Sequence, residues 1–412
     1  MRGLLLILFT YLLSSTAPGA SAGALEQTIH ARLALMKDVA HAKWVTGRPI
    51  EDLAREQVVI EQAVISGLQF RLTPAATTRF FTAQIEAAKA IQRYWFTVWA
   101  TEPPNGPAPE LGAQIRPRLL VLGDQILAEL GTQPEVESEA TFIQQTRLDG
   151  LPGDYQIALY QSLRSLAYFT SPLDQIRESR ILRVGTTLDY APFSYVNANG
   201  ERQGFDIELA EQLAHELGAR IHWVETSWPT LMRDFSEGKF DIGMSGISII
   251  PARAEQAYFS LPYHTGGKTP ISRCETAQHL ANLEAIDQPS VKVIVNPGGT
   301  NERYVRQHVT RAEIMVHPSN RTIFDALLEG QADVMITDAI EVAVMTSRYP
   351  TLCATMPGQR LSEQDKGILM PKSDALRAWI DDHLDALLSD GTLKALMHSA
   401  IKRAANPTNN HY

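Results

Sequence analysis

The stretch SPLDQIRESRILRVGTT (171–187) separates two patterns of secondary structure. Before it, apolar residues recur at intervals of three and four, which is typical of amphipathic helices. From ILRVGTT (181–187) onward, short apolar strands alternate with amphipathic helices, which predicts parallel α/β sheets. Two sheets fit the order of these elements better than one. The predicted divisions are a signal peptide (1–22), an all-helical domain (23–172), a two-lobed α/β domain (173–405) and a C-terminal tail (406–412).

The length and composition of the chain limit its possible partners. Its 412 residues suffice for two to three domains that each bury a core. A net charge of −9 argues against nucleic acid and anionic membrane surfaces, although an acidic protein can still hold small cationic pockets. The sequence contains no CxxC motif, Cys/His cluster, Walker loop or dinucleotide fingerprint, so we expect no metal and no cofactor. The oligomeric state stays open, and a homo-oligomer is compatible with the sequence.

The first 22 residues have the pattern of a secretory signal peptide. Arg2 provides a basic start, Leu4 to Leu13 form an apolar segment, and Ala20-Ser21-Ala22 forms a cleavage site. The apolar segment is too short to span a bilayer. We therefore expect a mature protein in the periplasm that starts near Gly23, with no membrane association.

The chain contains two cysteines, Cys274 and Cys353, both in its second half. Because the expected compartment is oxidising and the count is even, we predict a disulfide between them. Two buried free thiols are the alternative.

Helix-breaking and helix-starting residues divide the first half. Thr73-Pro74 combines an N-cap with a proline at the first helical position. The segment TEPPNGPAP (101–109) is a loop that no helix could cross. The expected helices cover about 25–45, 49–70, 74–100 and 111–130, with two more between 135 and 169.

Charged residues on these helices have spacings that let them converge on one ligand. Arg32 and Lys43 are eleven residues apart, about three helical turns, so both would face one side of the first helix. Asp52 and Arg55 are three apart and would be neighbours on the second helix. The third and fourth helices add Gln92 and Arg116. Spacing alone also fits ordinary surface cations.

The segments RPIEDLAREQ (48–57) and FFTAQIEAAKAIQ (80–92) resemble the secreted, gamma-class, all-helical chorismate mutases. The resemblance extends over roughly 24–169 and implies rearrangement of chorismate to prephenate. It implies that three arginines bind the substrate carboxylates: Arg32, Arg55 and Arg116. It implies that Lys43 and Gln92 contact the ether oxygen and that Asp52 orders the cations.

Three positions complicate this assignment. Arg118 is an alternative to Arg116, since the RPR sequence (116–118) offers both arginines. Val59 stands where a relative has glutamine, and Ala88 where one has threonine, so polar contacts there are lost or replaced. The proposed rearrangement still needs no nucleophile and no proton transfer, only a held conformer and cations that stabilise developing charge.

The second half resembles periplasmic solute-binding proteins, which have two lobes around a ligand cleft. SGISIIPAR (245–253) is similar to their SGLTITxxR segment, in which the arginine, here Arg253, binds a ligand carboxylate. NPGGT (296–300) follows a predicted strand and precedes a helix. Its backbone N–H groups can therefore bind an anion at the helix N-terminus.

Five segments together are similar to cyclohexadienyl dehydratases: SWPTLMRDF (227–235), MSGISI (244–249), GKTPIS (267–272), NPGGTNE (296–302) and TDAIE (337–341). The resemblance extends over about 174–400. It implies removal of water and carbon dioxide from prephenate or arogenate. The predicted substrate-binding residues are Trp228, Ser245, Ser248, Arg253, Lys268, Thr269, Asn296, Gly299, Thr300 and Asp338.

This chemistry needs a proton donor near the leaving hydroxyl. We predict Glu341 as the general acid, because its apolar neighbours should raise the pKa of its carboxyl. Glu302 is the alternative acid, although Arg303 and Arg306 beside it favour its ionised form. A capping box with Asp338 is the structural alternative for Glu341.

The sequence therefore predicts a bifunctional enzyme of phenylalanine biosynthesis, an isomerase followed by a lyase. It would take chorismate to prephenate and then to phenylpyruvate, or arogenate to phenylalanine. The alternative is a non-catalytic periplasmic solute-binding protein for an amino acid or aromatic acid, with a helical appendage. Glu341 and Asn296 distinguish the two, because a receptor for an amino acid needs neither.

Overall fold

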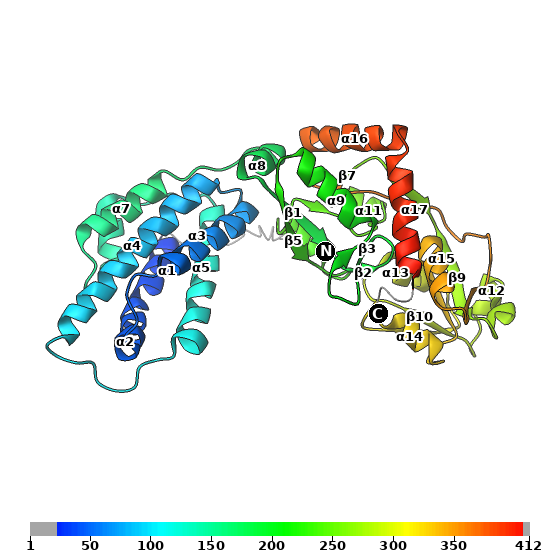
Figure 1. Ribbon diagram of the computed structural model, residues 1–412, viewed down its shortest axis with the longest axis horizontal. Coiled ribbons are helices and arrows are strands. Elements are labelled where there is room, and N and C mark those ends of the chain that lie inside the picture. Colours follow the sequence, from blue (N-terminus) through cyan, green and yellow to red (C-terminus); the bar gives the residue numbers. More distant parts are fainter. Residues whose placement is uncertain (1–22, 407–412) are drawn as a thin grey trace, which may run out of the picture. The chain divides into compact units, whose positions relative to one another are not determined.

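The computed structural model describes residues 23–406, which form two compact units (Figure 1). The first unit ends at Tyr168 and the second begins at Phe169. The predicted domain boundary after Pro172 falls a few residues later. The predicted signal peptide (1–22), and the tail after Asn406, lie outside the described residues. Within 23–406, no helix is long and apolar enough to cross a membrane.

The first unit is a helical assembly arranged around α4 (Pro74–Trp99), which contacts α2, α3 and α7. The Thr73 side chain accepts the N–H of Ala76 and Pro74 occupies the first turn, which confirms the predicted start of this helix. Fully buried side chains such as Ile29 and Phe80 form its core. The other helices are α1 (Ala24–Ala34), α2 (Met36–Thr46), α3 (Leu53–Gly67), α5 (Arg116–Gly131), α6 (Glu139–Gln145) and α7 (Gly153–Arg164).

Two predicted helices begin or end differently in the structure. The expected single helix over 25–45 is interrupted at Leu35, so that α1 packs mainly on α5 while α2 packs on α4. The expected start near Pro49 is wrong, because the helix begins at Leu53 with Asp52 as its N-cap. The segment 47–52 is instead a loop, whose Ile50 carbonyl accepts a hydrogen bond from Lys43. The fourth helix also begins with a π-helical turn (Leu111–Ile115).

The second unit contains two five-stranded sheets, as predicted, but both are mixed rather than purely parallel. The first sheet has the order β5-β1-β6-β15-β7, and the second has the order β11-β10-β12-β9-β13. In each sheet one strand, β15 in the first and β9 in the second, runs antiparallel to both of its neighbours, and the other four strands run in the same direction. Their bounds are β1 (Ile181–Thr186), β5 (Arg220–Glu225), β6 (Ile242–Gly243), β7 (Tyr258–Phe259), β9 (Lys268–Arg273), β10 (Lys292–Val295), β11 (Glu313–Val316), β12 (Val334–Asp338), β13 (Leu352–Ala354) and β15 (Leu369–Met370).

A two-stranded antiparallel ribbon connects the two sheets in sequence. It consists of β8 (His264–Gly266) and β14 (Gln364–Lys366), in which Lys366 pairs with His264. The chain passes from β8 into β9 of the second sheet and returns through β14 to β15 of the first. A small third sheet contains β2 (Asp189–Tyr190), β3 (Ser194–Val196) and β4 (Arg202–Gln203).

Helices cover the sheets and begin at the carboxyl ends of their parallel strands. α13 (Thr300–His308) follows β10, and α15 (Ala339–Arg348) follows β12 directly. In open α/β sheets this edge is where ligands bind. The remaining helices are α8 (Pro172–Ser179), α9 (Phe205–Glu216), α10 (Leu231–Ser236), α11 (Pro251–Ala254), α12 (Leu283–Ile286), α14 (Ile323–Leu328), α16 (Asp374–Ser389) and α17 (Thr392–Ala405).

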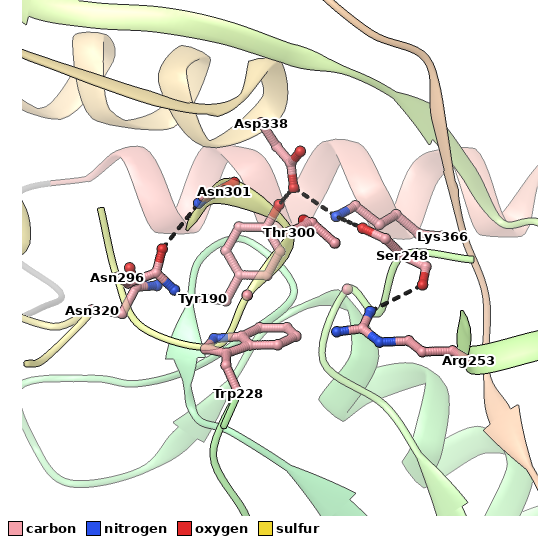
Figure 2. Close-up of a pocket in the computed structure, with 12 residues that line it drawn as sticks. Tyr190, Trp228, Ser248, Arg253, Asn296, Thr300, Asn301, Asn320, Asp338 and Lys366 are labelled. Atoms are coloured by element: carbon pink, nitrogen blue, oxygen red, sulfur yellow. Dashed lines mark hydrogen bonds and ion pairs between the residues drawn. The ribbon is translucent and has the colours of Figure 1, made fainter. Parts of the chain in front are cut away.

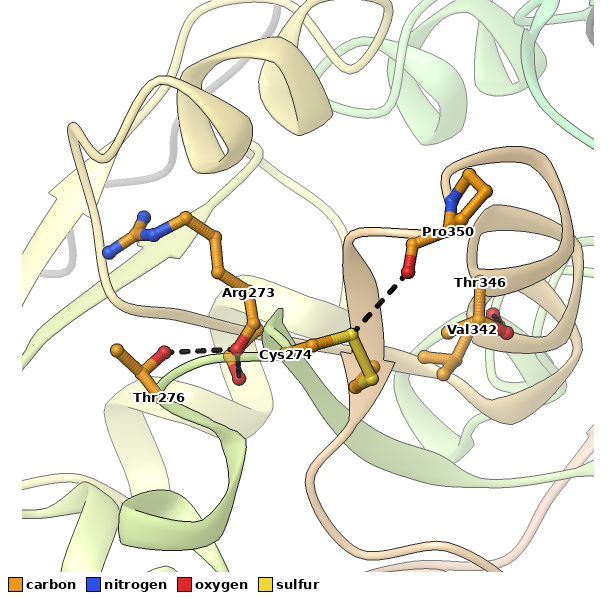
Figure 3. Close-up of a disulfide and its surroundings, with 8 residues drawn as sticks. Arg273, Cys274, Thr276, Val342, Thr346 and Pro350 are labelled. Carbon is orange, nitrogen blue, oxygen red and sulfur yellow. Dashed lines mark hydrogen bonds between the residues drawn. A yellow bond between two sulfur atoms is a disulfide. The ribbon is translucent and has the colours of Figure 1, made fainter.

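Cys274 and Cys353 form a disulfide, with sulfur atoms 2.06 Å apart (Figure 3). The predicted pair is therefore confirmed, and the free-thiol alternative is wrong. The bond links the end of β9 to β13, the neighbouring edge strand. It thereby joins the strand that begins at Lys268 to the segment that follows α15.

We expect the two units to unfold independently when the chain is divided before Ser171. Ser171 caps α8, and Leu173 and Ile176 of that helix belong to the core of the second unit. Fragments 23–170 and 171–412 should each show one cooperative denaturant transition. The midpoint of each should equal that of the same unit in the full chain. Insoluble fragments, or midpoints shifted strongly downward, would instead indicate a shared core.

We expect the double variant Cys274→Ser/Cys353→Ser to destabilise only the second unit. The disulfide closes a segment of 79 residues, and removing such a bond typically costs ~2–5 kcal/mol. Denaturant unfolding of the full chain measures this, with the transition of the cysteine-free helical unit as the internal reference. Equal stability of the variant and the wild type would contradict the expectation.

Candidate active sites

A cavity of about 510 Å³ opens in the helical unit. All six residues predicted to bind substrate line it: Arg32, Lys43, Asp52, Arg55, Gln92 and Arg116. Arg118 is not among its lining residues, so the structure favours Arg116 over this alternative. Val59 and Ala88, the two departures from the family pattern, also lie in the wall. The interruption of the first helix at Leu35 does not separate Arg32 from Lys43 at this cavity.

Arg32 is buried in the cavity wall, with 8% of its surface exposed. Its Nη1 donates a hydrogen bond to Oε1 of Gln84, 3.0 Å away. Among the described residues, no carboxylate forms an ion pair with this guanidinium. Burial lowers the pKa of Arg32 to about 10, so it remains a cation at neutral pH. An anionic ligand at this wall therefore meets a largely uncompensated positive charge.

Lys43 and Asp52 lie where the cavity meets the 47–52 loop. Nζ of Lys43 donates to the carbonyl of Ile50 at 2.6 Å. Burial lowers the pKa of the Lys43 ammonium, and the Asp52 carboxylate opposes that shift. Oδ1 of Asp52 accepts the backbone N–H of Arg55 at 3.1 Å. Asp52 thus holds the start of α3, which positions the exposed Arg55 at the cavity.

Gln92 is buried on α4, and its amide nitrogen is engaged in contacts other than the predicted one to an ether oxygen. Its Nε2 donates to the Ala88 carbonyl at 3.1 Å and contacts the Met36 sulfur at 3.8 Å. Its Oε1 has no hydrogen-bond partner among the described residues. To donate to an ether oxygen, the amide would have to release its sulfur contact or rotate, either of which is a small change.

The sequence analysis missed Lys89, a buried cation in the same wall. Its Nζ forms ion pairs with Glu86 at 2.7 Å, Glu56 at 3.1 Å and Glu51 at 3.5 Å. These pairs connect α4 to the start of α3 and the loop before it. An isolated lysine in a helical pattern gives no signal of such a contact.

A second cavity lies in the α/β unit, where segments that follow strands of both sheets meet (Figure 2). Its volume is about 20 Å³, roughly the space of one water molecule. An organic substrate therefore enters only if the wall rearranges. Seven predicted binding residues line this cavity: Trp228, Ser248, Arg253, Asn296, Gly299, Thr300 and Asp338.

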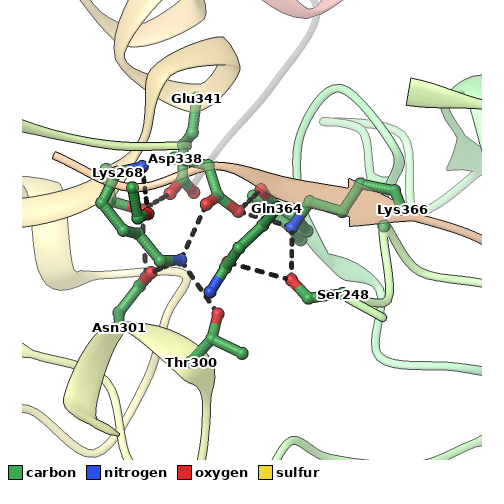
Figure 4. Close-up of polar contacts among 12 residues, drawn as sticks. Ser248, Lys268, Thr300, Asn301, Asp338, Glu341, Gln364 and Lys366 are labelled. Carbon is green, nitrogen blue, oxygen red and sulfur yellow. Dashed lines mark hydrogen bonds and ion pairs between the residues drawn. The ribbon is translucent and has the colours of Figure 1, made fainter. Parts of the chain in front are cut away.

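The Asp338 carboxylate lies at the end of β12 between two buried lysines (Figure 4). Nζ of Lys268 is 2.7 Å from one oxygen, and Nζ of Lys366 is 2.6 Å from the other. The hydroxyl of Tyr190 also donates to this carboxylate. Burial opposes ionisation of Asp338, but the two ammonium groups outweigh it and hold its pKa well below the usual value. Asp338 is therefore an anion.

Glu341 lies in the first turn of α15, is buried, and does not itself line the cavity. The Thr337 hydroxyl donates to one carboxyl oxygen, and the other oxygen has no partner among the described residues. The pKa of Glu341 is raised to about 8, chiefly by burial, with a further contribution from the Asp338 anion, while the Thr337 hydrogen bond opposes the shift. Glu341 is therefore protonated at neutral pH, as a general acid must be.

The structure supports neither Glu302 as the acid nor a capping-box role for Glu341. Glu302 accepts the N–H of Gly298 at 2.7 Å and pairs with Arg306 at 2.8 Å, and these contacts lower its pKa. A capping box would place the Glu341 carboxyl on the backbone N–H of Asp338, whereas it contacts the side chain of Thr337. The capping-box interpretation is wrong.

Three predicted binding residues do not reach the cavity wall. Lys268 lies behind it and holds Asp338, Asn301 and Thr300. Ser245 is buried and accepts the N–H of Thr187 at 3.0 Å. The buried hydroxyl of Thr269 has no partner among the described residues. Lys268 is therefore better described as a support of the wall than as a ligand contact.

Five wall residues were not predicted: Tyr190, Gly246, Asn301, Asn320 and Lys366. Asn301 belonged to the NPGGTNE segment and could have been chosen from that motif. Lys366 carried no signal, because only the pairing of β14 with β8 brings it to Asp338 and Ser248. Within 23–406, no group of three or more His, Cys, Asp or Glu side chains is placed to hold a metal ion.

The buried Glu341 should make the second unit less stable as the pH rises. Its folded pKa of about 8 lies above the ordinary value of 4.5, so the folded state binds the proton more tightly. Stability should therefore fall between about pH 5 and 8 by a few kcal/mol, at ~1.4 kcal/mol per pH unit. Denaturant unfolding of Glu341→Gln should show a smaller slope, most clearly between pH 7 and 8, because Asp189 and Asp206 of the same unit, with pKa values raised to about 6 and about 7, contribute mainly below that range.

The matched control is Glu302→Gln. The pKa of Glu302 is lowered, so its contribution to stability is lost only as the pH falls through the acid range. Between pH 5 and 8, the free energy of unfolding of this variant should change with pH as steeply as that of the wild type. A wild-type slope that survives in Glu341→Gln would show that another group carries the titration.

Comparison with known proteins assigns a family to each unit. Residues 182–402 match the bacterial extracellular solute-binding proteins, family 3, and residues 24–93 match chorismate mutase type II. The cyclohexadienyl dehydratase of Pseudomonas aeruginosa is 48% identical over 233 residues, which cover 57% of this chain and 87% of that protein. The L-cystine-binding protein TcyJ of Escherichia coli (strain K12) is 27% identical over 227 residues, 54% of this chain and 84% of that protein.

A solved structure is also similar to part of this chain. The ancestral amino acid-binding protein AncCDT-1, described as a precursor of cyclohexadienyl dehydratase, superposes with a TM-score of 0.53 at 34% identity. It covers 56% of this chain and 100% of its own.

These matches confirm the predicted fold class, the two family resemblances and the pair of enzyme classes, an isomerase region and a lyase region. The matched solute-binding family is extracellular by name, which agrees with the predicted export. The chain belongs to the bacterial extracellular solute-binding proteins of family 3, together with cyclohexadienyl dehydratase, and carries a chorismate mutase type II region ahead of that domain.

Proposed function

We propose that this chain is a bifunctional periplasmic enzyme of phenylalanine biosynthesis. The helical unit would rearrange chorismate to prephenate. The α/β unit would convert prephenate to phenylpyruvate, or arogenate to phenylalanine. The observation that carries the proposal is the buried, protonated Glu341 beside the ionised Asp338, because a receptor needs no buried acid with a raised pKa.

The helical cavity suits a rearrangement without proton transfer. Its arginines Arg32, Arg55 and Arg116 can bind the two carboxylates of chorismate and hold the folded conformer in which the reacting carbons meet. Lys43 would face the ether oxygen, where negative charge develops as the C–O bond breaks. Gln92 would add a neutral donor to that oxygen once its amide turns. Val59 and Ala88 would contact the ring rather than hydrogen-bond to it.

The α/β cavity suits an acid-assisted elimination. Glu341 would donate its proton to the leaving hydroxyl as the C–O bond breaks, so that water departs. The bond between the ring and its carboxylate breaks at the same time, and its electron pair completes the aromatic ring as carbon dioxide leaves. Lys268, beside both carboxyl groups, would stabilise the negative charge that remains on Glu341. Arg253 would hold the carboxylate of the side chain that stays.

The ion pairs of Asp338 also bear on the alternative of an amino-acid receptor. Both oxygens of this carboxylate are occupied by lysine ammonium groups. A ligand amine could reach Asp338 only by displacing one of them. The saturated carboxylate therefore favours catalysis over capture of an amino acid. A contact between Asp338 and the amine of arogenate would require the same displacement.

A coupled experiment tests both activities. Purified protein given chorismate should release phenylpyruvate without added metal or cofactor. Glu341→Gln should accumulate prephenate instead, because general acid catalysis typically contributes ~10²–10⁴-fold to kcat. Consumption of chorismate should stay at the wild-type rate, since the helical cavity is unchanged.

Glu302→Gln, which removes a half-buried carboxylate from the same unit, is the matched control and should form phenylpyruvate normally. Loss of dehydration in Glu302→Gln alone would transfer the acid role to Glu302. A wild type that leaves chorismate unchanged but dehydrates added prephenate would contradict the mutase half of the proposal.

A further inference from the structure

Gln84 lies on α4 behind Arg32 and has no assigned role. Its side chain is fully buried, and it does not line the helical cavity itself. Its Oε1 accepts the hydrogen bond from Nη1 of Arg32 at 3.0 Å. The ring of Phe81, 6.0 Å from the guanidinium carbon, supports Arg32 from another direction. The arginine thus stands between the cavity and a neutral amide.

The chemistry of the two groups explains why this contact differs from an ordinary ion pair. A guanidinium carries only donors, so the amide must turn its oxygen toward Arg32. A carboxylate in the same place would hold the arginine more strongly, but it would also compensate the charge of the guanidinium. The amide fixes the arginine by a single hydrogen bond and leaves its full charge directed at the cavity.

Buried N–H groups without a partner in the Arg32–Gln84 pair are consistent with a site that binds an anionic ligand. Among the described residues, Nε of Arg32 and Nε2 of Gln84 have no hydrogen-bond partner. Buried donors are normally paired, and a buried cation without a counter-ion costs folding free energy. Such a cost is compensated when an anionic ligand occupies the wall.

We propose that Gln84 is a positioning residue of the helical site, whose neutral amide holds Arg32 in place while keeping its charge available for a substrate carboxylate. The proposal rests on the proposed mutase function. It adds a requirement that the family resemblance does not include, namely that the residue behind Arg32 be an acceptor without charge.

The isosteric substitution Gln84→Glu tests this requirement. The new carboxylate should pair with Arg32 and compensate its charge. KM for chorismate should rise by about 10–100-fold, the contribution of one charge-assisted hydrogen bond, while kcat changes less. The melting temperature of the helical unit should stay the same or rise, because the new ion pair stabilises the folded state. A merely structural role predicts the opposite combination, a lower melting temperature with normal KM.

A second substitution keeps the test decisive if Gln84→Glu does not fold. Gln84→Met preserves volume but removes the acceptor, so Arg32 loses its hold and KM should again rise by about tenfold. The control is Gln57→Glu, which introduces the same charge at an exposed position of α3 outside the cavity lining. Its KM should match that of the wild type.

The outcomes separate this inference from the proposed function. A wild type without mutase turnover would overturn the proposed function itself. An active wild type with unchanged KM in a folded Gln84→Glu or Gln84→Met would overturn the role of Gln84 alone. A rise in KM of equal size in Gln57→Glu would also overturn it, since the effect would then follow from net charge.

Discussion

The chemistry of the α/β unit depends on one buried carboxylate, that of Asp338, held between the ammonium groups of Lys268 and Lys366. Burying three charged groups is costly, and such a cluster persists only where the pairs have good geometry. It joins three segments far apart in sequence, β9, β12 and β14. It also affects the protonation of the neighbouring acid. Full burial and the ionised Asp338 together keep the Glu341 carboxyl protonated.

Under the proposed function, the two sites would handle anionic substrates in different ways. In the helical unit, Arg32 is a buried cation that no carboxylate among residues 23–406 pairs with, so the wall attracts a carboxylate but offers no acid. In the α/β unit the lysines are already paired, and the reactive group is a neutral carboxyl. The first arrangement suits a rearrangement in which no proton moves, and the second suits an elimination that needs one proton.

Local motifs predicted much of both sites, because the relevant residues lie next to recognisable element ends. TDAIE (337–341) at a strand-to-helix junction placed Asp338 and Glu341 correctly. Lys366 could not be found this way, since its position depends on pairing between strands about a hundred residues apart. Gln84 was missed because a glutamine within an apolar helical pattern is not distinctive. The interruption at Leu35 carries neither glycine nor proline, so the periodicity continued through it unbroken.

Glu341 must be a neutral acid at the working pH if it is the proton donor of the α/β unit. Infrared difference spectroscopy of the wild type against Glu341→Gln measures this directly, through the carbonyl stretch of a protonated carboxyl group. At pH 6.5 the spectrum should contain such a band that is absent from the variant and that disappears as the pH rises through about 8. A carboxylate band alone at pH 6.5 would show that Glu341 is ionised and would contradict the account.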